Sequence, residues 1–422
     1  MTRRLFPGRV LVGLGFACAV ALTAPLLLAV ASPTAMAAEE EGKQTVRPEI
    51  GKPLQAAQQL IKEHKFGEAL AKLREADAVE KKTAYEESVL NTLRLIAAAN
   101  AGEPGVAAKA YDALAGGGSL PAEQRLKFVE AIASAYFQTK DYGSAVTWAN
   151  RYFAGGGTDM AVRTLVTNAY YLNNDFANAG KMAQELIEQY EHGGQPAPES
   201  VLQLLASCAL KQNDKKGYAV ALEKLVAAYP NANYWADLIH QTTAKAGFPE
   251  RLSLDVFRLE AAVGTLSGVG SYMEFAELAI QAGLPAEAKA VVEKGYAAGV
   301  LGTGTEAERH GRLRDMAKRS TDADQKTLAA GEAEAAKAAN GDPMVNNGLD
   351  YYGYGQMDKA VALIEQGIAK GNLKYPDDAK LHLGIVFLAA GQKAKAIDAW
   401  KSIKSNDAVA DLARLWIIKA RS

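Results

Sequence analysis

The chain has 422 residues, with 47 lysines and arginines against 48 aspartates and glutamates, so its formal net charge is −1. That length exceeds the ~250–300 residues at which a single compact core stops growing, so several domains or a repeat architecture are expected. The balanced charge argues against nucleic-acid binding as the main role. Two cysteines and five histidines are too few for a disulfide framework or a structural zinc site.

Residues 1–37 have the pattern of a secretory signal peptide. Three arginines precede a long apolar run, and the small residues that follow it end in Ala35-Met36-Ala37. A basic start, an apolar middle and an A-x-A end predict export, with cleavage after Ala37. An uncleaved membrane anchor is the alternative, and Pro25 within the apolar run favours cleavage. No second run of about 20 apolar residues follows, so no further membrane span is expected.

A repeat runs through the rest of the chain. A small residue, a bulky one three positions later, a polar turn and an alanine recur, as at Ala133/Tyr136 and Gly384/Phe387. This pattern is typical of the tetratricopeptide repeat, in which two antiparallel helices cross closely at small residues. The residue that opens each second helix recurs at intervals of about 34–39 residues. We place it at Ala69, Ala107, Ala145, Ala179, Tyr218, Leu252, Ala288, Asp324, Ala360 and Ala396.

The pattern predicts an all-α, tetratricopeptide-type α-solenoid, a right-handed superhelix of about ten helical hairpins ended by a closing helix. Residues 38–52 are expected to form a linker, and 53–298 the first solenoid part, with about seven repeats. Residues 299–341 are interpreted as two helices of a degenerate repeat, or as an insertion. Residues 342–422 are expected to hold two repeats and the closing helix, in which Trp416 covers the last repeat.

Motifs of catalytic, cofactor-binding or metal-binding sites are not recognisable in the sequence. The histidines are scattered, and we interpret them as solvated or packed imidazoles. Carboxylates that alternate with lysines along the helices are interpreted as a solvated surface. Cys208 lies mid-helix among apolar neighbours, so we interpret it as a buried small hydrophobe and not as a nucleophile. We therefore expect no enzymatic activity, no cofactor and no metal.

Surface recognition is the remaining class of function. The first helices of the repeats are expected to line a groove that suits an extended peptide or a helix, because it combines rings, amides and acids. Phe137, Tyr171 and Tyr352 have packing between repeats as an alternative role. Few basic residues face the groove, which disfavours capture of a chain terminus by its carboxylate. The predicted groove positions are Glu130, Phe137, Asn168, Tyr171, Gln203, Tyr234, Asp237, Gln241, Met273 and Tyr352.

Two stretches carry a family resemblance. "ALEKLVAAYPNANYWADLIHQ", with Tyr234-Trp235, and "AKGNLKYP" at 369–376 are similar to repeats of the periplasmic tetratricopeptide proteins associated with TonB systems. The resemblance implies a periplasmic, non-enzymatic accessory of the TonB–ExbB–ExbD machinery, which passes inner-membrane proton-motive energy to outer-membrane receptors. It implies TonB, ExbB or ExbD as partners. Residues 299–341 depart from the family pattern.

Two other functions stay open at this point. A periplasmic scaffold for polysaccharide export or cell-wall assembly is the first alternative, because the tetratricopeptide fold serves several envelope processes and fold alone does not decide between them. An enzyme is the second alternative. It would need a polar constellation in the groove, and the sequence offers no such constellation.

Overall fold

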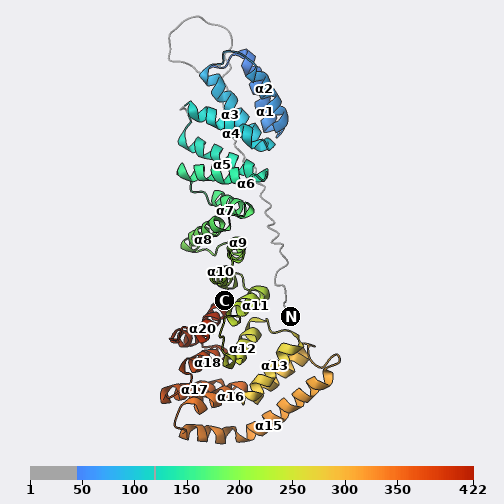
Figure 1. Ribbon diagram of the computed structural model, residues 1–422, viewed down its shortest axis with the longest axis vertical. Helices are drawn as coiled ribbons and strands as arrows, with labels where there is room; N and C mark the ends of the chain where they lie inside the picture. The colour runs from blue at the N-terminus through green and yellow to red at the C-terminus, as the bar shows by residue number, and fades with distance from the viewer. Residues whose placement is uncertain (1–44, 118–119) are drawn as a thin grey trace. The chain divides into compact units, whose positions relative to one another are not determined.

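The computed structural model describes residues 45–117 and 120–422 (Figure 1). The predicted signal peptide, 1–37, lies outside these residues. Within them every regular element is helical, which confirms the all-α prediction, and no helix has the length and apolar character needed to cross a bilayer. The chain divides between Asn213 and Asp214 into two compact units. This division falls inside the segment predicted as one solenoid part, 53–298.

The first unit is a stack of helices in which each contacts the next along the chain. Its first helix begins at Pro48, so residues 48–52 are helical and not a linker. Proline suits the first position of a helix because its missing N–H would have no partner there. In the described part of this unit the helices are α1 (Pro48–Lys62), α2 (Phe66–Asp77), α3 (Ala84–Ala101), α4 (Pro104–Gly116), α5 (Ala122–Gln138), α6 (Tyr142–Ala154), α7 (Met160–Leu172), α8 (Phe176–His192) and α9 (Glu199–Lys211).

The second unit differs from a regular stack in one long helix. Its elements are α10 (Lys215–Ala228), α11 (Ala232–Thr243), the 3₁₀ turn η1 (Glu250–Leu252), α12 (Ser253–Val263), α13 (Gly268–Gln281), α14 (Pro285–Ala297), α15 (Ala307–Lys337), α16 (Asp342–Gly353), α17 (Met357–Lys370), α18 (Pro376–Ala389), α19 (Lys393–Lys401) and α20 (Ala408–Arg421). The prediction of two helices within 299–341 is wrong, because α15 is continuous. Asp324, expected to open a helix, lies inside α15, where no glycine or proline interrupts residues 312–330.

Seven hairpin turns share one backbone geometry. Each contains a residue with positive φ, and the residue after it donates its N–H to a carbonyl five positions back, as Asp141 does to Tyr136 at 3.0 Å. This bond closes the first helix of the hairpin. Positions counted back from the turn are therefore equivalent in different repeats. The positive-φ residues are His64, Gly102, Lys140, Asn174, Gly283, Gly355 and Gly391.

Small residues lie where helices cross, as the repeat requires. Nine of the ten register positions predicted from the sequence are buried, and Asp324 is the exception. A Cβ atom at Gly384 would collide with the indole of Trp400. Trp416 in α20 stacks on Trp400, with ring centroids 5.8 Å apart. The prediction that the closing helix covers the last repeat is thereby confirmed.

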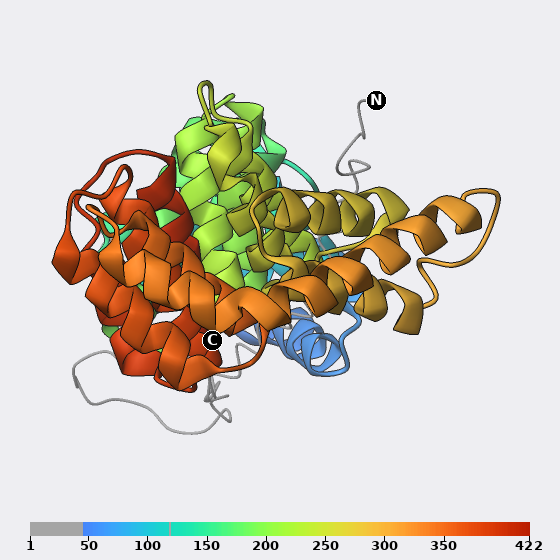
Figure 2. The same ribbon diagram turned by 90° about the horizontal axis from the view of Figure 1, so that it is seen from below.

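The same closing helix also contacts the beginning of the second unit. Besides α18 and α19, α20 packs against α10, α11 and α12. Asp411 of α20 pairs with Lys245 at 2.5 Å, and Arg414 pairs with Glu223 of α10 at 2.8 Å. Figure 2 shows α15 crossing this unit, where it packs on both α14 and α16. The second unit is therefore closed on itself by contacts between its first and last helices.

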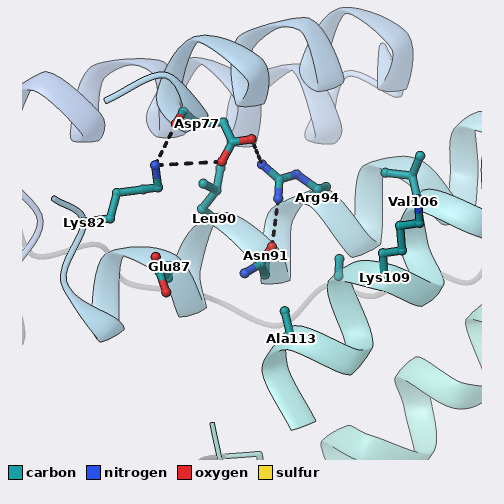
Figure 3. A pocket seen from close by; sticks show the side chains of 10 residues that line it. Asp77, Lys82, Glu87, Leu90, Asn91, Arg94, Val106, Lys109 and Ala113 are labelled. Carbon is teal, nitrogen blue, oxygen red and sulfur yellow. Dashed lines mark hydrogen bonds and ion pairs between the residues drawn. The ribbon is translucent and has the colours of Figure 1, made fainter. Parts of the chain in front are cut away.

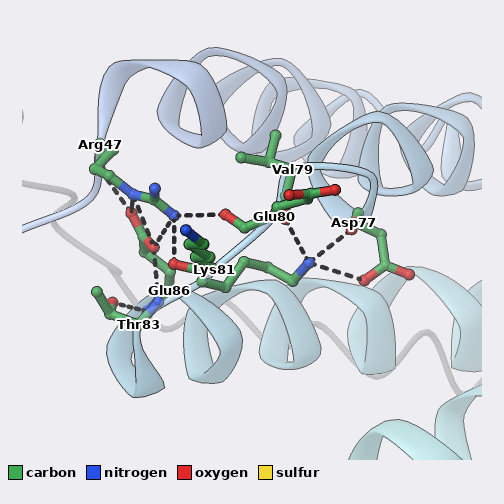
Figure 4. A network of polar contacts seen from close by, with 8 residues as sticks. Arg47, Asp77, Val79, Glu80, Lys81, Thr83 and Glu86 are labelled. Carbon is green, nitrogen blue, oxygen red and sulfur yellow. Dashed lines mark hydrogen bonds and ion pairs between the residues drawn. The ribbon is translucent and has the colours of Figure 1, made fainter.

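A buried carboxylate fixes the start of the first unit (Figure 4). Glu86 accepts hydrogen bonds from the Arg47 guanidinium, both at 2.9 Å, and from the backbone N–H of Thr83. The Thr83 hydroxyl accepts from the Glu86 N–H in return, which completes a capping box at the start of α3. The bond from Arg47 outweighs burial and lowers the pKa of Glu86 to about 2.

Replacing Glu86 with alanine is expected to lower the free energy of unfolding of the first unit by about 2 kcal/mol. The change removes the cap of α3 and leaves Arg47 without its partner. Urea unfolding measures the loss, and hydrogen exchange locates it in α1–α3. Glu87→Ala is the matched control, because Glu87 is the exposed next residue, and we expect at most about 0.5 kcal/mol there. Equal losses in the two variants would contradict the role of Glu86.

Candidate interaction face of the first unit

Helices α5, α7 and α9 present equivalent stripes of side chains. The positive-φ residues that follow them are Lys140, Asn174 and Asn213. Counting back three, six and ten positions from each gives residues spaced i, i+4 and i+7, which share one face of a helix. We call these nine residues the α5–α7–α9 face. They are Phe137, Tyr171 and Leu210; Ser134, Asn168 and Ser207; and Glu130, Thr164 and Gln203.

Contacts between helices join the stripes into one surface. The odd-numbered helices pack on one another, α3 on α5 and α5 on α7. The hydroxyls of Tyr171 on α7 and Ser207 on α9 lie 2.7 Å apart, and the Gln212 amide donates to the carbonyl of Phe176 at 3.1 Å. Five predicted groove residues, Glu130, Phe137, Asn168, Tyr171 and Gln203, are thus brought together on this face.

One edge of the face is apolar and open. Leu210 is 49% exposed and Leu172, the last residue of α7, is 41% exposed. The half-buried rings of Phe137 and Tyr171 pack edge-on against Tyr142 and Phe176 in their own hairpin turns. Those turns hold the two rings in place, so the freely exposed apolar surface comes from the leucines. Sequence reasoning missed Leu210, although it lies three residues before a turn, as Phe137 and Tyr171 do.

The middle row is small and polar. Ser134 and Asn168 are each 8% exposed, and Ser207 is half-buried. The Asn168 amide nitrogen donates to the Thr164 carbonyl at 2.9 Å. The side-chain oxygen of Asn168 accepts no hydrogen bond from the described residues. Ser134 and Asn168 are therefore nearly closed to solvent, and Ser207 is the more accessible residue of this row.

The opposite edge carries an acid without a cation. Glu130 is half-buried, and no ion pair or hydrogen bond from the described residues reaches its carboxylate. Burial raises the pKa of Glu130, and the nearby carboxylate of Asp159 raises it further. Lys127, one turn away, is held by Glu123 at 2.7 Å. A carboxylate partly removed from water without a counter-charge is unfavourable, so this edge is suited to a positively charged group.

The remaining predicted groove residues belong to the second unit and do not form an open face. Tyr234, Asp237 and Met273 are 7%, 5% and 5% exposed, and the Tyr218 hydroxyl donates to Asp237 at 3.2 Å. Their placement in an open groove is wrong, because Asp237 is buried against Tyr218 of α10, Tyr234 is buried on the same helix, and Met273 belongs to the core between α13 and α14. Gln241 and Tyr352 are half-buried.

A separate open pocket of about 360 Å³ lies between α2, α3 and α4 (Figure 3). The Asp77 carboxylate forms ion pairs with Arg94, at 3.0 Å, and with Lys82, at 3.9 Å. Arg94 also donates a hydrogen bond to the side-chain oxygen of Asn91. The acids and bases of the pocket thus largely neutralise one another, so it offers little free charge to a ligand. Its charged lining residues are Asp77, Lys82, Glu87, Arg94 and Lys109.

Cys208 is the cysteine that the described residues contain. Cys208 is 1% exposed, and burial raises the pKa of its thiol to about 12, so the thiolate is not formed at neutral pH. Its prediction as a buried hydrophobe is confirmed. In the part of the chain that the structure describes, no three or more His, Cys, Asp or Glu side chains are arranged to hold a metal ion.

Comparison with known proteins identifies the repeats. The tetratricopeptide repeat family matches residues 200–232 and 378–408. No curated protein sequence matches the chain. The helical hairpins and these matches define a tetratricopeptide-type α-solenoid, a fold of protein-interaction scaffolds.

Several solved structures are similar to this chain over much of its length. The TPR2AB domain of yeast Sti1, in complex with pHSP90, is 13% identical, with 70% of this chain and 98% of that chain covered and a TM-score of 0.24. Naa15/Naa10 bound to HypK-THB is 16% identical, with 84% and 57% covered and a TM-score of 0.29. Yeast Tom70 is 12% identical, with 88% and 95% covered and a TM-score of 0.24.

Proposed function

We propose that this protein is a non-enzymatic periplasmic scaffold that binds a protein partner through the α5–α7–α9 face. The observation that carries the proposal is the composition of that face. On this face Leu210 is exposed, the Phe137 and Tyr171 rings pack against rings of their own hairpins, and Glu130 on the opposite edge has no cation among the described residues. A face with immobile rings and open apolar side chains gives contact area at low entropic cost. The predicted signal peptide supports export.

We further propose that the partner is a component of the TonB–ExbB–ExbD machinery, so that the scaffold is an accessory of energy transfer to outer-membrane transport. Support comes from the resemblance of Tyr234-Trp235 and of 369–376 to repeats of TonB-associated periplasmic proteins. Trp235 is 3% exposed and lies in the core of the second unit. The resemblance therefore bears on shared architecture.

Site-specific crosslinking in cells tests this function. A photo-reactive amino acid at Leu210 is expected to capture TonB, ExbB or ExbD. The same probe at Lys181, an exposed residue of α8 outside the α5–α7–α9 face, is the matched control and should capture none of them. Capture of polysaccharide-export or cell-wall proteins alone, or equal capture at both positions, would overturn the proposed role. Recovery of the chain from the periplasm with Ala38 as its first residue tests the export step.

A further inference from the structure

We propose that α15 is a self-association surface. A second copy of this chain would dock its own α15 there, antiparallel to the first, about a two-fold axis at the level of Ala317. The occupant is thus another molecule of the same protein. This inference concerns the second unit alone and goes beyond the function proposed above, because it involves neither the α5–α7–α9 face nor a TonB-system partner.

One side of α15 has no other helix of the second unit against it. The opposite side packs on α13, α14 and α16, where it buries Leu313, Ala317 and Leu328. The helix lies at the edge of the second unit, and Figure 2 shows its outer side uncovered. Because no glycine or proline interrupts residues 312–330, this outer side is a continuous helical surface that another helix can follow.

The outer side carries charges in a repeating order. An acidic residue is followed four positions later by a basic one, and this combination recurs every seven residues, so all six side chains share one face of the helix. All six are exposed. They are Glu308 and Arg312, Asp315 and Arg319, and Asp322 and Lys326.

These charges are little used within the molecule. Glu308 and Arg312 lie 3.8 Å apart, and their side chains are 95% and 72% exposed. The side chains of the other four form no ion pair with the described residues. Arg314, on another side of the helix, is by contrast held by Glu293 at 2.7 Å. The outer row is therefore available to a second molecule.

The order of these charges is self-complementary when the second helix runs antiparallel. At nine, five and two positions from Ala317, an acid on one side is matched by a base on the other. A two-fold axis at Ala317 brings each acid of one copy level with a base of the other, and the symmetry repeats every such pair. The matched residues are Glu308 with Lys326, Arg312 with Asp322, and Asp315 with Arg319.

The charges also select the direction and the register of the contact. A parallel pair in register would place acids beside acids and bases beside bases, which is unfavourable. An antiparallel pair moved by one heptad would leave two of the six charged residues opposite uncharged ones, for example Asp322 opposite Thr305 or Glu308 opposite Ala333. Pairing about Ala317 therefore matches the charges most completely.

Met316 supports this position of the axis. It lies one position from Ala317, beside the charged row, and it is 40% exposed. Antiparallel pairing brings the two copies of Met316 together, so that each shields the other from water. A lipid surface is a poorer occupant, because the outer side alternates acids with bases, and Met316 is the one large apolar side chain that the described residues of α15 expose.

Sedimentation equilibrium of the mature chain, residues 38–422, tests the inference. Solvent-exposed ion pairs are weak and are screened by salt, so we expect a reversible dimer whose Kd rises about tenfold between about 0.05 M and about 0.5 M salt. Asp315→Lys and Arg319→Glu each bring like charges together twice, and each should raise the Kd by about tenfold or more. Asp358→Lys, the same charge change at an exposed position of α17, is the matched control and should dimerise like the wild type.

An equimolar mixture of the Asp315→Lys and Arg319→Glu variants tests the pairing itself. In a mixed dimer the altered position of one variant faces the altered position of the other, so opposite charges meet again. We expect the mixture to dimerise although neither variant does so alone. This rescue cannot arise from contacts within one helix, because each chain carries a single substitution.

Three results would overturn the inference. The first is a wild type that stays monomeric at low salt up to about 1 mM. The second is dimerisation that Asp315→Lys and Arg319→Glu leave unchanged, which would place the contact elsewhere. The third is a mixture that stays monomeric, which would refute the antiparallel register. Since none of these results affects capture of a partner at Leu210, failure of this inference and failure of the proposed function are distinguishable.

Discussion

Replacing Arg258 with methionine is expected to lower the free energy of unfolding of the second unit by about 3–5 kcal/mol. Arg258 is 5% exposed and binds the Glu287 carboxylate through two nitrogens, at 2.8 and 2.7 Å, and Asp255 through a third, at 2.8 Å. Methionine has a similar length but no charge. The variant would leave two carboxylates buried without their common cation, and that uncompensated charge is the source of the loss.

The network also joins distant parts of the second unit. The His382 ring nitrogen Nε2 on α18 lies 3.1 Å from Asp255 on α12, although 127 positions separate them in the sequence. Burial alone would raise the pKa of Asp255, but His382 and Arg258 outweigh it and lower the pKa to about 2. The carboxylate is therefore charged at neutral pH, and it depends on both partners.

A matched variant at Arg251 compares the loss of stability from a partly exposed ion pair with the loss from the buried network of Arg258. Arg251 also reaches α18, where it binds Asp378 at 2.9 Å, but its side chain is 31% exposed. Arg251→Met should cost no more than about 1 kcal/mol, as expected for a solvent-screened pair. Urea unfolding followed by tryptophan fluorescence measures both, because Trp235, Trp400 and Trp416 lie in this unit. A loss below about 1 kcal/mol for Arg258→Met would contradict the buried-network interpretation.

The helical hairpins are predictable from the sequence because their determinants are local. Ala145 and Ala396 are small because a neighbouring helix crosses there, and the turn that precedes each lies a few residues away. Such patterns recur with the period of the repeat, so one recognised repeat locates the next. The same logic places Glu130, Phe137, Asn168 and Tyr171 on one face, since all four are counted from equivalent turns.

Closure of the second unit is not predictable in this way, because its determinants are not local and do not repeat. The pairs Asp255–His382 and Asp411–Lys245 each join segments that are more than a hundred residues apart. The sequence does contain one signal. Leu252, Asp255 and Leu259 share a helical stripe, which puts a charge among core positions, whereas we interpreted such charges as a solvated surface. In the closed second unit the carboxylates of Asp255 and Glu287 are buried, and α20 packs against α11.

The continuous α15 was missed for a different physical reason. The period placed a turn before Asp324, but a turn needs a residue that ends the preceding helix, and residues 312–330 contain no glycine or proline. The helix therefore continues and extends across both α14 and α16. Asp324 is thereby directed at α16, where it meets a second carboxyl group, Asp350.

That meeting gives the second large prediction, a pH dependence of stability that Asp350→Asn should abolish. Asp350 is 8% exposed, its Oδ1 atom is buried without a hydrogen-bond partner, and the Asp324 carboxylate lies close enough to act on it. The Tyr354 hydroxyl donates to Asp324 at 2.8 Å. Burial first, and then the Asp324 charge, raise the pKa of Asp350 to about 7.

The sign follows from proton binding. An aspartate in the unfolded chain has a pKa near ~3.9, so between about pH 4 and pH 7 the folded protein holds a proton that the unfolded chain has released. The contribution of Asp350 to stability is therefore fully present below about pH 4. It declines as the pH rises to about 7, by at most about 4 kcal/mol, and then levels off.

Asparagine at position 350 keeps the shape and a donor for Asp324 but cannot ionise. We expect Asp350→Asn to match the wild type near pH 4.5 and to be more stable by about 2–4 kcal/mol at pH 8. The measurement is the difference between variant and wild type in urea unfolding at each pH, so that every contribution shared by the two proteins cancels. Asp358→Asn, at an exposed position in α17, is the control and should show a constant difference. A constant difference for Asp350→Asn as well would show that the two carboxyl groups share no proton.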